Sequence, residues 1–547
     1  MANEVGCITQ EGHGRRQGPF RQPEHSAAAD EKRVQDTTNS PNARRVLQRA
    51  RFRFPHWHMD PFSLILAALS LGGGIALAAL LPWPLNLSAG LFIGPVAWFA
   101  YEGCYGVYAR NKDLPSPWAC SLGGVYFDDD AFCRGWDISG KTGSGKTSSG
   151  VIPLLYSLKQ NRPNAGILVL DTKGDLADPL VEISKELSCT NSLRIIEVRP
   201  EGALPNWSPP FTMNFLADKS VPYSTYAKLL VDIATAAGQK GGQAFFKTAA
   251  QSAIYHGFAA LDALDWPVTI ENCFSLITDQ SDLQNAATEL ANRANPQHEW
   301  IVAYFAEMLQ QPAEQLGGIR STVANYLQPF VQPDIAEVFC PVTDPTFRME
   351  EMDAGALVCV RIPQKYQVEK KYISLLLKVL FYLHALRRYD LPTADRKAKN
   401  LIVMALDEAQ ETVLVSEDGI SDFNVVDKIR GARATTINST QSPTSYIPPM
   451  GGKEKAEVFL LNLANKIFFT AADSVASEMI ANSIGKHTVK KKTYGRSAGK
   501  ANLSWTDDDQ HYIKPHQLRA LPKHCAIVKH CEQRHRQVRL RPTRFTS

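Results

Sequence analysis

The stretch WDISGKTGSGKTSSGVIPLL, residues 136–155, decides the fold. Gly140, Gly145, Lys146 and Thr147 fit the pattern G-x-x-x-x-G-K-[ST] without a mismatch. An apolar-rich stretch, residues 132–138, precedes the pattern and predicts a strand, and residues 147–161 predict a helix, with a kink or an early end at Pro153. In a strand–loop–helix unit of this kind, the glycine-rich loop holds the phosphates of a nucleotide.

The residue types of this loop explain its chemistry. Glycines allow successive backbone N–H groups to turn toward one phosphate, and the start of the helix adds its positive dipole end. We expect Lys146 to reach the β- and γ-phosphates and the Thr147 hydroxyl to contact Mg²⁺. Gly143 and Ser148 belong to the same loop and are expected to contact the nucleotide as well. The loop therefore predicts binding of ATP with Mg²⁺.

Two further segments predict strands that end in acidic residues. GILVLDTKGD ends at Asp171, and NLIVMALDEAQ ends at Asp407 and Glu408. The second has the longer apolar run, which is typical of a strand buried on both faces. We therefore expect Asp407 to hold Mg²⁺ through water and Glu408 to polarise the attacking water. Asp171 is expected at the end of a neighbouring parallel strand, facing the same crevice and in contact with the nucleotide. Lys173 and Gly174 after it can touch nucleotide or substrate.

The segment DKIRGARATTINSTQS carries a third group of candidates. It predicts a strand over residues 435–439, with Gln441 at its tip, where a polar side chain can sense the γ-phosphate. Arg430 or Arg433 could reach the nucleotide of a neighbouring subunit as an arginine finger. The alternative is that both arginines belong to a solvated helix face, and the residues alone leave this open.

Helical periodicity dominates the region between these two halves of the site. Residues 214–322 are rich in Ala, Leu, Gln and charged residues, and strand patterning resumes at GALVCVRIP, residues 355–363. The sequence thus predicts an α/β nucleotide-binding domain with an all-α domain inserted into it.

The N-terminal part predicts a membrane anchor. Residues 62–81 are twenty consecutive residues without a charge, enough to span about 30 Å as a helix. A second apolar run, residues 85–101, follows after the short turn PWPLN. Basic residues flank both runs, so we expect a transmembrane hairpin with both chain ends in the cytoplasm; the alternative is a buried hairpin of a soluble protein. The polar residues before it predict a disordered tail.

Charge and cysteine usage add weaker indications. The net charge of +4 is too small to indicate a nucleic-acid partner, although residues 523–547 hold seven Lys or Arg and one acid, Glu532. The candidate DNA contacts are Lys490, Lys491, Lys492, Arg496 and the C-terminal arginines, with a solvated charged face as the alternative. Ten cysteines without paired spacing fit a reduced compartment. In KHCAIVKHCEQRH no zinc spacing is present, so a strand is favoured over a metal site.

The order of these motifs resembles the type IV coupling proteins of conjugation and type IV secretion, the TraG/TraD family. The resemblance extends from the membrane hairpin onward. It is carried by GKTGSGKT, VLDTKGDL, GGIRSTVANYLQPF, LDEAQ, IRGARATTINSTQS and LNLANKIFFTAADSVASEMIANSIG. Two details depart from the family: the turn PWPLN is short, and Ala409-Gln410 follows the acids in place of the common Phe-Ala or Leu-Ala.

The resemblance implies a RecA-like P-loop motor, a homo-hexameric ring and two helices in the bacterial inner membrane, in contact with lipid. It implies a role in bringing a DNA–relaxase complex or effector proteins to the inner-membrane components of a type IV secretion channel. The family's phosphate-binding lysine falls on Lys146, its Walker B acids on Asp407 and Glu408, its glutamine on Gln441 and its trans-acting arginine on Arg430.

The expected domains are a cytoplasmic tail (1–60), a transmembrane hairpin (61–109), the nucleotide-binding domain in two parts (110–213 and 323–547) and the inserted all-α domain (214–322). Two rival functions remain. One is an FtsK-like DNA translocase, although no winged-helix pattern follows residue 490. The other is a membrane cargo receptor that uses nucleotide only as a switch.

Overall fold

A nine-stranded sheet organises the part of the chain that the structure describes. The structure is a computed structural model, and it describes residues 116–545 except 240–243, 417–418 and 498–499. The strand order is β13-β12-β9-β3-β8-β7-β4-β6-β5. The strands of this sheet are β3 (Trp136–Ser139), β4 (Gly166–Leu170), β5 (Leu193–Glu197), β6 (Leu357–Arg361), β7 (Ile402–Leu406), β8 (Ala434–Thr440), β9 (Asn465–Phe468), β12 (Cys525–Lys529) and β13 (Arg536–Arg539).

Most of the sheet is parallel. The seven strands from β9 to β5 are parallel to their neighbours, whereas β12 is antiparallel to β9 and to β13. Strand β8 lies between β3, which leads into the glycine-rich loop, and β7, which ends in the two acids. Because these strands are parallel, their carboxyl ends meet at one edge of the sheet, where ligands of open α/β sheets bind.

Both faces of the sheet are buried, as the apolar strands require. Ile167 and Val169 of β4 belong to a cluster with α6 and α7, while Leu168 and Leu170 belong to a second cluster with α15. This division follows from the two-residue period of a strand. The helices are α6 (Ile152–Asn161), α7 (Ala177–Glu186) and α15 (Gln367–Arg387).

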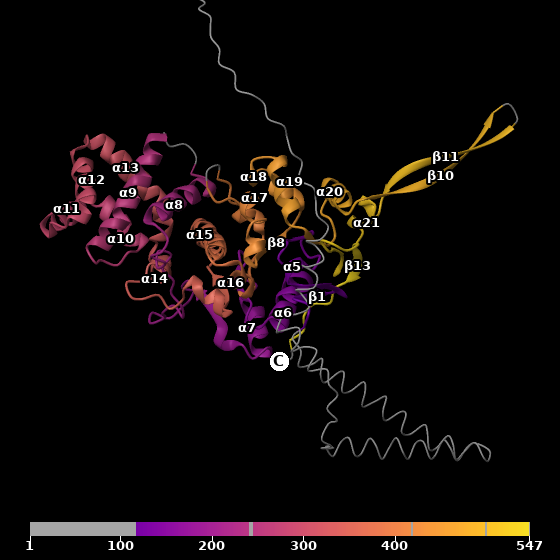
Figure 1. Cartoon of the computed structure of the whole chain (residues 1–547), viewed down its shortest axis with the longest axis horizontal. Helices are drawn as coiled ribbons and strands as arrows, with labels where there is room; N and C mark the ends of the chain where they lie inside the picture. The colour runs from indigo at the N-terminus through magenta and orange to yellow at the C-terminus, as the bar shows by residue number, and fades with distance from the viewer. Residues whose placement is uncertain (1–115, 240–243, 417–418, 498–499, 546–547) are drawn as a thin grey trace, which may run out of the picture. The chain divides into compact units, whose positions relative to one another are not determined.

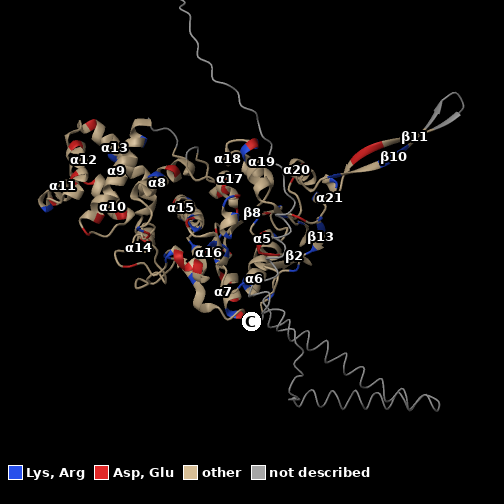
Figure 2. Ribbon diagram, in the orientation of Figure 1, with Lys and Arg blue, Asp and Glu red and all other residues tan. Residues whose placement is uncertain are grey.

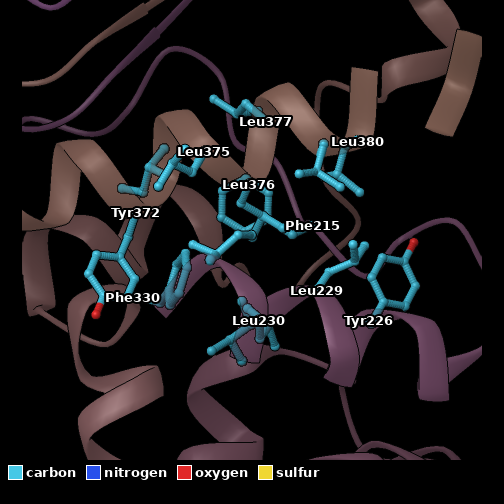
Figure 3. Packing of buried hydrophobic residues seen from close by; sticks show 14 of the residues in the cluster. Phe215, Tyr226, Leu229, Leu230, Phe330, Tyr372, Leu375, Leu376, Leu377 and Leu380 are labelled. Atoms are coloured by element: carbon cyan, nitrogen blue, oxygen red, sulfur yellow. The ribbon is translucent and has the colours of Figure 1, made fainter. Parts of the chain in front are cut away.

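Between β5 and β6, the described residues of 198–356 contain seven α-helices and no strand (Figure 1). They are α8 (Tyr223–Ala237), α9 (Ala244–Ala263), α10 (Ile270–Thr278), α11 (Gln280–Arg293), α12 (Glu299–Gln310), α13 (Ala313–Leu327) and α14 (Pro333–Phe339). Leu375 and Leu376 of α15 pack with Phe215 and with Leu230 of α8 (Figure 3). The helices share this buried cluster with the sheet, and the domain boundaries proposed above stay predictions.

The remaining helices are short. They are α5 (Asp129–Phe132), α16 (Thr393–Ala398), α17 (Asp422–Val425), α18 (Ile447–Met450), α19 (Lys453–Asn462), α20 (Ser474–Ile484) and α21 (Pro515–Arg519). Short 3₁₀ helices occupy Thr190–Ser192, Pro296–His298, Gln328–Phe330, Met349–Ala354, Arg388–Asp390, Ala409–Thr412, Ile429–Ala432 and Pro443–Tyr446.

Two antiparallel hairpins complete the fold. A small one joins β1 (Cys120–Leu122) and β2 (Val125–Phe127). A long one joins β10 (Lys486–Ser497) and β11 (Lys500–His511), with twelve residues in each strand. Figure 1 shows this long hairpin reaching away from the sheet.

Two local expectations differ from the structure. The strand before the glycine-rich loop begins at Trp136, because Phe132 ends α5 and a turn over residues 133–135 separates that helix from the strand. The first turn of α5 is capped by Asp128, which accepts from the Ala131 amide at 2.8 Å. The early helix end at Pro153 is wrong. A π-helical turn, Lys146–Val151, precedes α6, and the Ile152 amide donates to Thr147, five residues back. This wider turn accommodates a proline that would clash with the carbonyl four residues back in a regular α-helix.

The predicted tail (1–60) and transmembrane hairpin (61–109) lie outside the described residues. Among the helices that are described, none combines the length and the apolar character needed to cross a bilayer.

Candidate nucleotide-binding site

The glycine-rich loop runs from the end of β3 to the helix that begins at Lys146. Gly143 and Gly145 adopt left-handed backbone conformations, with φ of 78° and 104°, which glycine adopts without a steric cost. A side chain at Gly140 would place its Cβ 2.6 Å from the Cβ of Phe469, so packing also requires glycine there. These conformations let the loop amides turn toward one point, as a phosphate requires.

Lys146 is almost completely buried, with 6% of its surface exposed. Its ammonium donates a hydrogen bond of 2.7 Å to the Gly140 carbonyl, so the lysine closes over its own loop. Burial lowers the pKa of Lys146, and the charges of Glu408 and Asp407 oppose this effect. The lysine and the two acids therefore share one electrostatic environment, although more than 250 residues separate them in the sequence.

Asp407 directly follows β7 and is 3% exposed. Its Oδ1 atom is buried and accepts no hydrogen bond from the described residues. Burial raises the pKa of Asp407, while the Lys173 ammonium lowers it. An unpartnered buried carboxylate oxygen calls for a cation or an ordered water, because an unsatisfied polar group is costly.

Glu408 is strained and doubly hydrogen-bonded. Its backbone is left-handed, with φ of 48°, which is uncommon outside glycine and occurs at functional sites. Lys173 donates to Oε1, and Gln410 donates to Oε2 at 2.8 Å. Burial alone would raise the pKa of Glu408, but the hydrogen bonds from Gln410 and Lys173 lower it overall.

Asp171 lies at the end of β4, but its carboxylate holds its own loop. Oδ1 accepts from the amides of Lys173 and Gly174, at 3.0 and 2.8 Å, and Oδ2 accepts from the Leu176 amide at 2.6 Å. This arrangement assigns Asp171 to fixing the turn that positions Lys173. Direct contact between Asp171 and a nucleotide stays a prediction.

Gln441 is exposed at the end of β8, beside the glycine-rich loop. The carbonyl of Thr440 accepts from the Gly140 amide at 3.3 Å, and the Thr440 hydroxyl donates to Gln410 at 2.8 Å. Thr440 thus connects the loop to the residue that holds Glu408. Thr147 and Ser148 lie in the first turn of the helix and are half-buried.

Arg430 and Arg433 lie at the opposite edge of the sheet, before β8 begins. Arg430 pairs with Asp130 at 2.9 Å and Arg433 with Asp129 at 2.6 Å, both on α5 at the amino end of β3. The seven residues of β8 separate the two edges by about 20 Å. Neither arginine is therefore placed to reach the phosphate loop of its own chain.

His524 contacts the phosphate loop in a way that the sequence did not indicate. Its amide donates to the Ser144 carbonyl at 3.0 Å, and its Nδ1 is hydrogen-bonded to the Ser149 hydroxyl at 2.7 Å. A Cβ at Gly145 would lie 2.6 Å from that nitrogen, so the glycine also makes room for the imidazole. Ser149 and His524 are 375 positions apart, and no signal in the sequence connects them. The sequence likewise contains no signal that connects Lys173 with Glu408.

The residues fit a nucleotide with Mg²⁺. Left-handed glycines, a buried lysine and an unpartnered Asp407 oxygen lie at one edge of the sheet. No group of three or more His, Cys, Asp or Glu side chains in the described part of the chain is arranged to hold a metal by itself. Mg²⁺ often keeps several waters and binds through one carboxylate and substrate phosphates, as Thr147 and Asp407 would allow.

The fold and the loop define a P-loop protein of the α/β class. Residues 105–534 match the family described as Type IV secretory system Conjugative DNA transfer, and the chain belongs to this family. Its fold is similar to that of the bacterial conjugative coupling protein TrwBdeltaN70, with a TM-score of 0.56 and 15% identity over 80% of this chain and 92% of that chain. The resemblance to TraG/TraD-type coupling proteins is confirmed.

Two other comparisons differ in how much of the chain they cover. A structure of the plasmid coupling protein TrwB in complex with ADP and Mg²⁺ is similar, with a TM-score of 0.55 and 14% identity over 81% of this chain and 93% of that chain. A protein of Arabidopsis thaliana described as DEAD-box ATP-dependent RNA helicase 29 is 42% identical over 57 residues. That match spans 10% of this chain and 7% of the helicase, so it carries no argument about function.

Proposed function

We propose that this chain is an inner-membrane ATPase that couples ATP hydrolysis to the transfer of DNA into a type IV secretion channel. The unpartnered buried oxygen of Asp407 carries the proposal, because it lies with Lys146 and Glu408 at the nucleotide edge of the sheet. Membership in a conjugative DNA transfer family names the process that the energy would serve. The TrwB structure with ADP and Mg²⁺ supports the choice of ligand.

The proposed roles follow from the positions of the side chains. Lys146 leaves the Gly140 carbonyl to contact the β- and γ-phosphates, and Thr147 and Asp407 hold Mg²⁺, in part through water. Bound ATP supplies the phosphoanhydride bond whose hydrolysis releases energy. Glu408 orients a water and accepts its proton, and Gln441 senses the γ-phosphate from the tip of β8. Arg430 serves the site of a neighbouring subunit.

The assembly belongs to the proposal as well. A RecA-like motor whose arginine acts on the next subunit requires a ring, for which a homo-hexamer is the expected form. The apolar residues 61–109 anchor the ring in the bacterial inner membrane with both chain ends in the cytoplasm. A DNA–relaxase complex or effector proteins would be delivered to the inner-membrane components of the channel.

The test is ATP hydrolysis by the full-length protein, with and without DNA. We expect turnover that rises when DNA is added and that is abolished in Lys146→Ala, because the lysine contributes charge to the phosphates. Unchanged thermal unfolding of the variant is the control for folding. Normal hydrolysis by Lys146→Ala would contradict the site, and nucleotide binding without any turnover in wild-type protein would favour the nucleotide-switched receptor.

A further inference from the structure

The ammonium of Lys173 contacts both carboxylates that the proposed reaction needs. It pairs with Glu408 Oε1 and lies 3.5 Å from Asp407 Oδ2. The second oxygen of Glu408 accepts from Gln410. Both oxygens of the Glu408 carboxylate are thus engaged by protein donors, one of them a cation, so an attacking water must displace or share one of these donors to hydrogen-bond with Glu408. In this arrangement Glu408 is held away from its catalytic role.

The backbone around Lys173 is fixed by hydrogen bonds, whereas its side chain is partly exposed. Gln364 donates to the carbonyls of Thr172 and Lys173, at 3.0 and 2.9 Å, and Lys370 donates to Thr172 at 2.9 Å. The carboxylate of Asp171 binds the Lys173 amide. The side chain of Lys173 is nevertheless 45% exposed. A change of side-chain rotamer can therefore take the ammonium away from Glu408 without moving the loop.

A hollow of about 890 Å³ lies beside this ion pair, and Lys173 and Gln410 form part of its wall. It is built by the loops after β4, β6 and β7, by α15 and by the end of α8. The size is that of a typical ligand pocket. The hollow thus adjoins the proposed catalytic carboxylate of Glu408. Lys173 and Gln410, the two side chains that hydrogen-bond to Glu408, also line the hollow.

The charge of this hollow fits an anion. Its lysines are Lys173, Lys370 and Lys371, and its one acid is Glu411. Burial and the neighbouring Glu408 both raise the pKa of Glu411. Gln367 and Gln410 each use one amide N–H within the protein, so each has a second N–H as a hydrogen-bond donor for the hollow.

We propose that this hollow binds the phosphodiester backbone of a DNA strand, and that a strand phosphate draws Lys173 away from Glu408. ATP hydrolysis is then switched on where DNA is engaged and stays low without it. The inference rests on the proposed function, which supplies DNA as the cargo. Free phosphate or a second nucleotide carries the same chemistry, and the experiment distinguishes these sources.

The test compares ATP hydrolysis by full-length wild-type protein with that of Lys173→Gln, Lys173→Arg and Lys185→Gln. Lys185 is an exposed lysine of α7 that pairs with Glu182, so it serves as the matched control. Lys173→Gln frees Glu408, and we expect a basal kcat about fivefold higher, the size expected for one partly exposed ion pair. Its stimulation by single-stranded DNA should fall close to one, while Lys173→Arg should retain low basal turnover and stimulation.

Two results would overturn the inference. Lys173→Gln that is stimulated by DNA as strongly as wild-type protein would show that the lysine does not transmit the signal. Lys173→Gln that loses basal and stimulated turnover in equal measure, with unchanged nucleotide affinity and thermal unfolding, would place the lysine in the catalytic step instead. Wild-type protein without any turnover contradicts the proposed function, and the DNA site is then decided by cross-linking.

The cross-linking experiment identifies the occupant of the hollow. A photo-reactive amino acid is introduced at Gln367, on the wall of the hollow, and at Lys185 as the control. We expect a labelled DNA strand to be captured from position 367 and not from position 185. Polyphosphate, inorganic phosphate and excess ATP are added as competitors in separate arms. Absence of a DNA cross-link, or stimulation of turnover by inorganic phosphate alone, would exclude a strand as the occupant.

Discussion

Lys378 and Asp422 form a completely buried ion pair beneath the loop that follows the acids of β7. Lys378 donates to Asp422 Oδ2 at 2.7 Å and to the Thr412 carbonyl at 2.8 Å. Tyr382 donates to Asp422 Oδ1 at 2.7 Å, and the Leu414 amide donates to Oδ2 at 2.8 Å. Both carboxylate oxygens of Asp422 are hydrogen-bonded, so α15 holds the loop that follows Glu408.

Lys378→Met should destabilise the protein by about 3–5 kcal/mol, because it leaves the carboxylate of Asp422 buried and unpaired. Urea unfolding of wild-type and variant protein measures this difference. The double variant Lys378→Met/Asp422→Leu should recover part of the loss, since no buried charge remains. A loss below about 1 kcal/mol in the single variant would show that water reaches Asp422.

Glu408→Gln should bind ATP but hydrolyse it 10²–10⁴ times more slowly, the usual contribution of a general base. The amide keeps the shape of the side chain and loses the negative charge that accepts a proton. Fluorescent-nucleotide binding and turnover measure the two effects separately. If Asp171→Asn gave the larger loss of turnover with unchanged binding, the catalytic carboxylate would lie after β4 instead of β7.

At this scale the sequence reveals residues that act through a local pattern. Lys146 and the Asp407–Glu408 pair could be predicted because a loop or a strand end surrounds each with a recognisable context. Lys173 and His524 could not be assigned contacts, because their partners are 235 and 375 residues away and are brought near only by the order of the strands. Asp171 shows that the pattern can also mislead. Like Asp407 it follows a buried strand, but its carboxylate accepts hydrogen bonds from backbone amides of its own loop.

Among the elements, the long hairpin has an uneven distribution of charge. On one face Lys492 lies over the rings of Tyr494 and Trp505, with the ammonium 5.0 and 5.5 Å from their centres. Figure 2 shows the acidic stretch of β11, Asp507–Asp508–Asp509, in the half nearer the body of the protein. Tyr494 and Trp505 are 74% and 60% exposed. Exposed aromatic rings interleaved with lysine are typical of surfaces that bind single-stranded nucleic acid.

Trp505→Ala should weaken single-stranded DNA binding by about 1–3 kcal/mol if a base stacks on the indole. Lys492→Gln should reduce the slope of log K against log salt by about 0.7, the value for one phosphate contact on a single strand. Fluorescence anisotropy at several salt concentrations measures both effects. Lys491→Gln is the control, since Lys491 pairs with Thr506 on the other face. Equal effects of the two lysine variants would mean that the hairpin contributes to DNA binding only through its overall positive charge.

The elements also show what periodicity can predict. The apolar runs that end at Leu170 and Leu406 form buried strands because both faces of the sheet are covered. Phe132, the first residue of the strand predicted over 132–138, instead ends the helix α5, whose first turn is stabilised by the Asp128 cap. The π-helical turn before Pro153 depends on the phosphate loop and on the proline together. The helix propensity of either segment alone does not predict it.

For the whole molecule, the parallel order of the strands separates two functions between two edges of the sheet. The carboxyl ends of β3, β7 and β8 lead into the phosphate loop, Asp407 and Gln441, respectively. Arg430 lies before the amino end of β8. The residue pattern alone left Arg430 and Arg433 undecided, and the family resemblance assigned the trans-acting role to Arg430. Their exposure differs, because Arg430 is 42% exposed and Arg433 is 28% exposed. Each shares its aspartate with another arginine, Arg134 at Asp130 and Arg162 at Asp129. An exposed arginine at the far edge is available to another subunit.

Arg430→Ala should therefore remove ATP hydrolysis with little change in nucleotide affinity, because the arginine acts on the site of a neighbour. The loss should be on the order of 10³-fold or more, as for other arginine fingers. The Arg430–Asp130 pair is exposed and contributes little to stability, so the variant should unfold at nearly the wild-type temperature. Arg433→Ala serves as the comparison and should lower stability more than turnover.

Mixing two inactive proteins tests the shared site directly. Subunits with Lys146→Ala retain Arg430, and subunits with Arg430→Ala retain the phosphate loop, so an interface between them can contain one complete site. We expect partial recovery of turnover when the two full-length variants are combined, rising with the fraction of mixed interfaces. Full-length protein should also lose less activity on dilution than residues 116–547 alone, because membrane anchors raise the effective concentration of subunits. Absence of recovery, together with normal turnover of Arg430→Ala in dilute protein, would mean that each chain carries a complete site and that the ring is not required for hydrolysis.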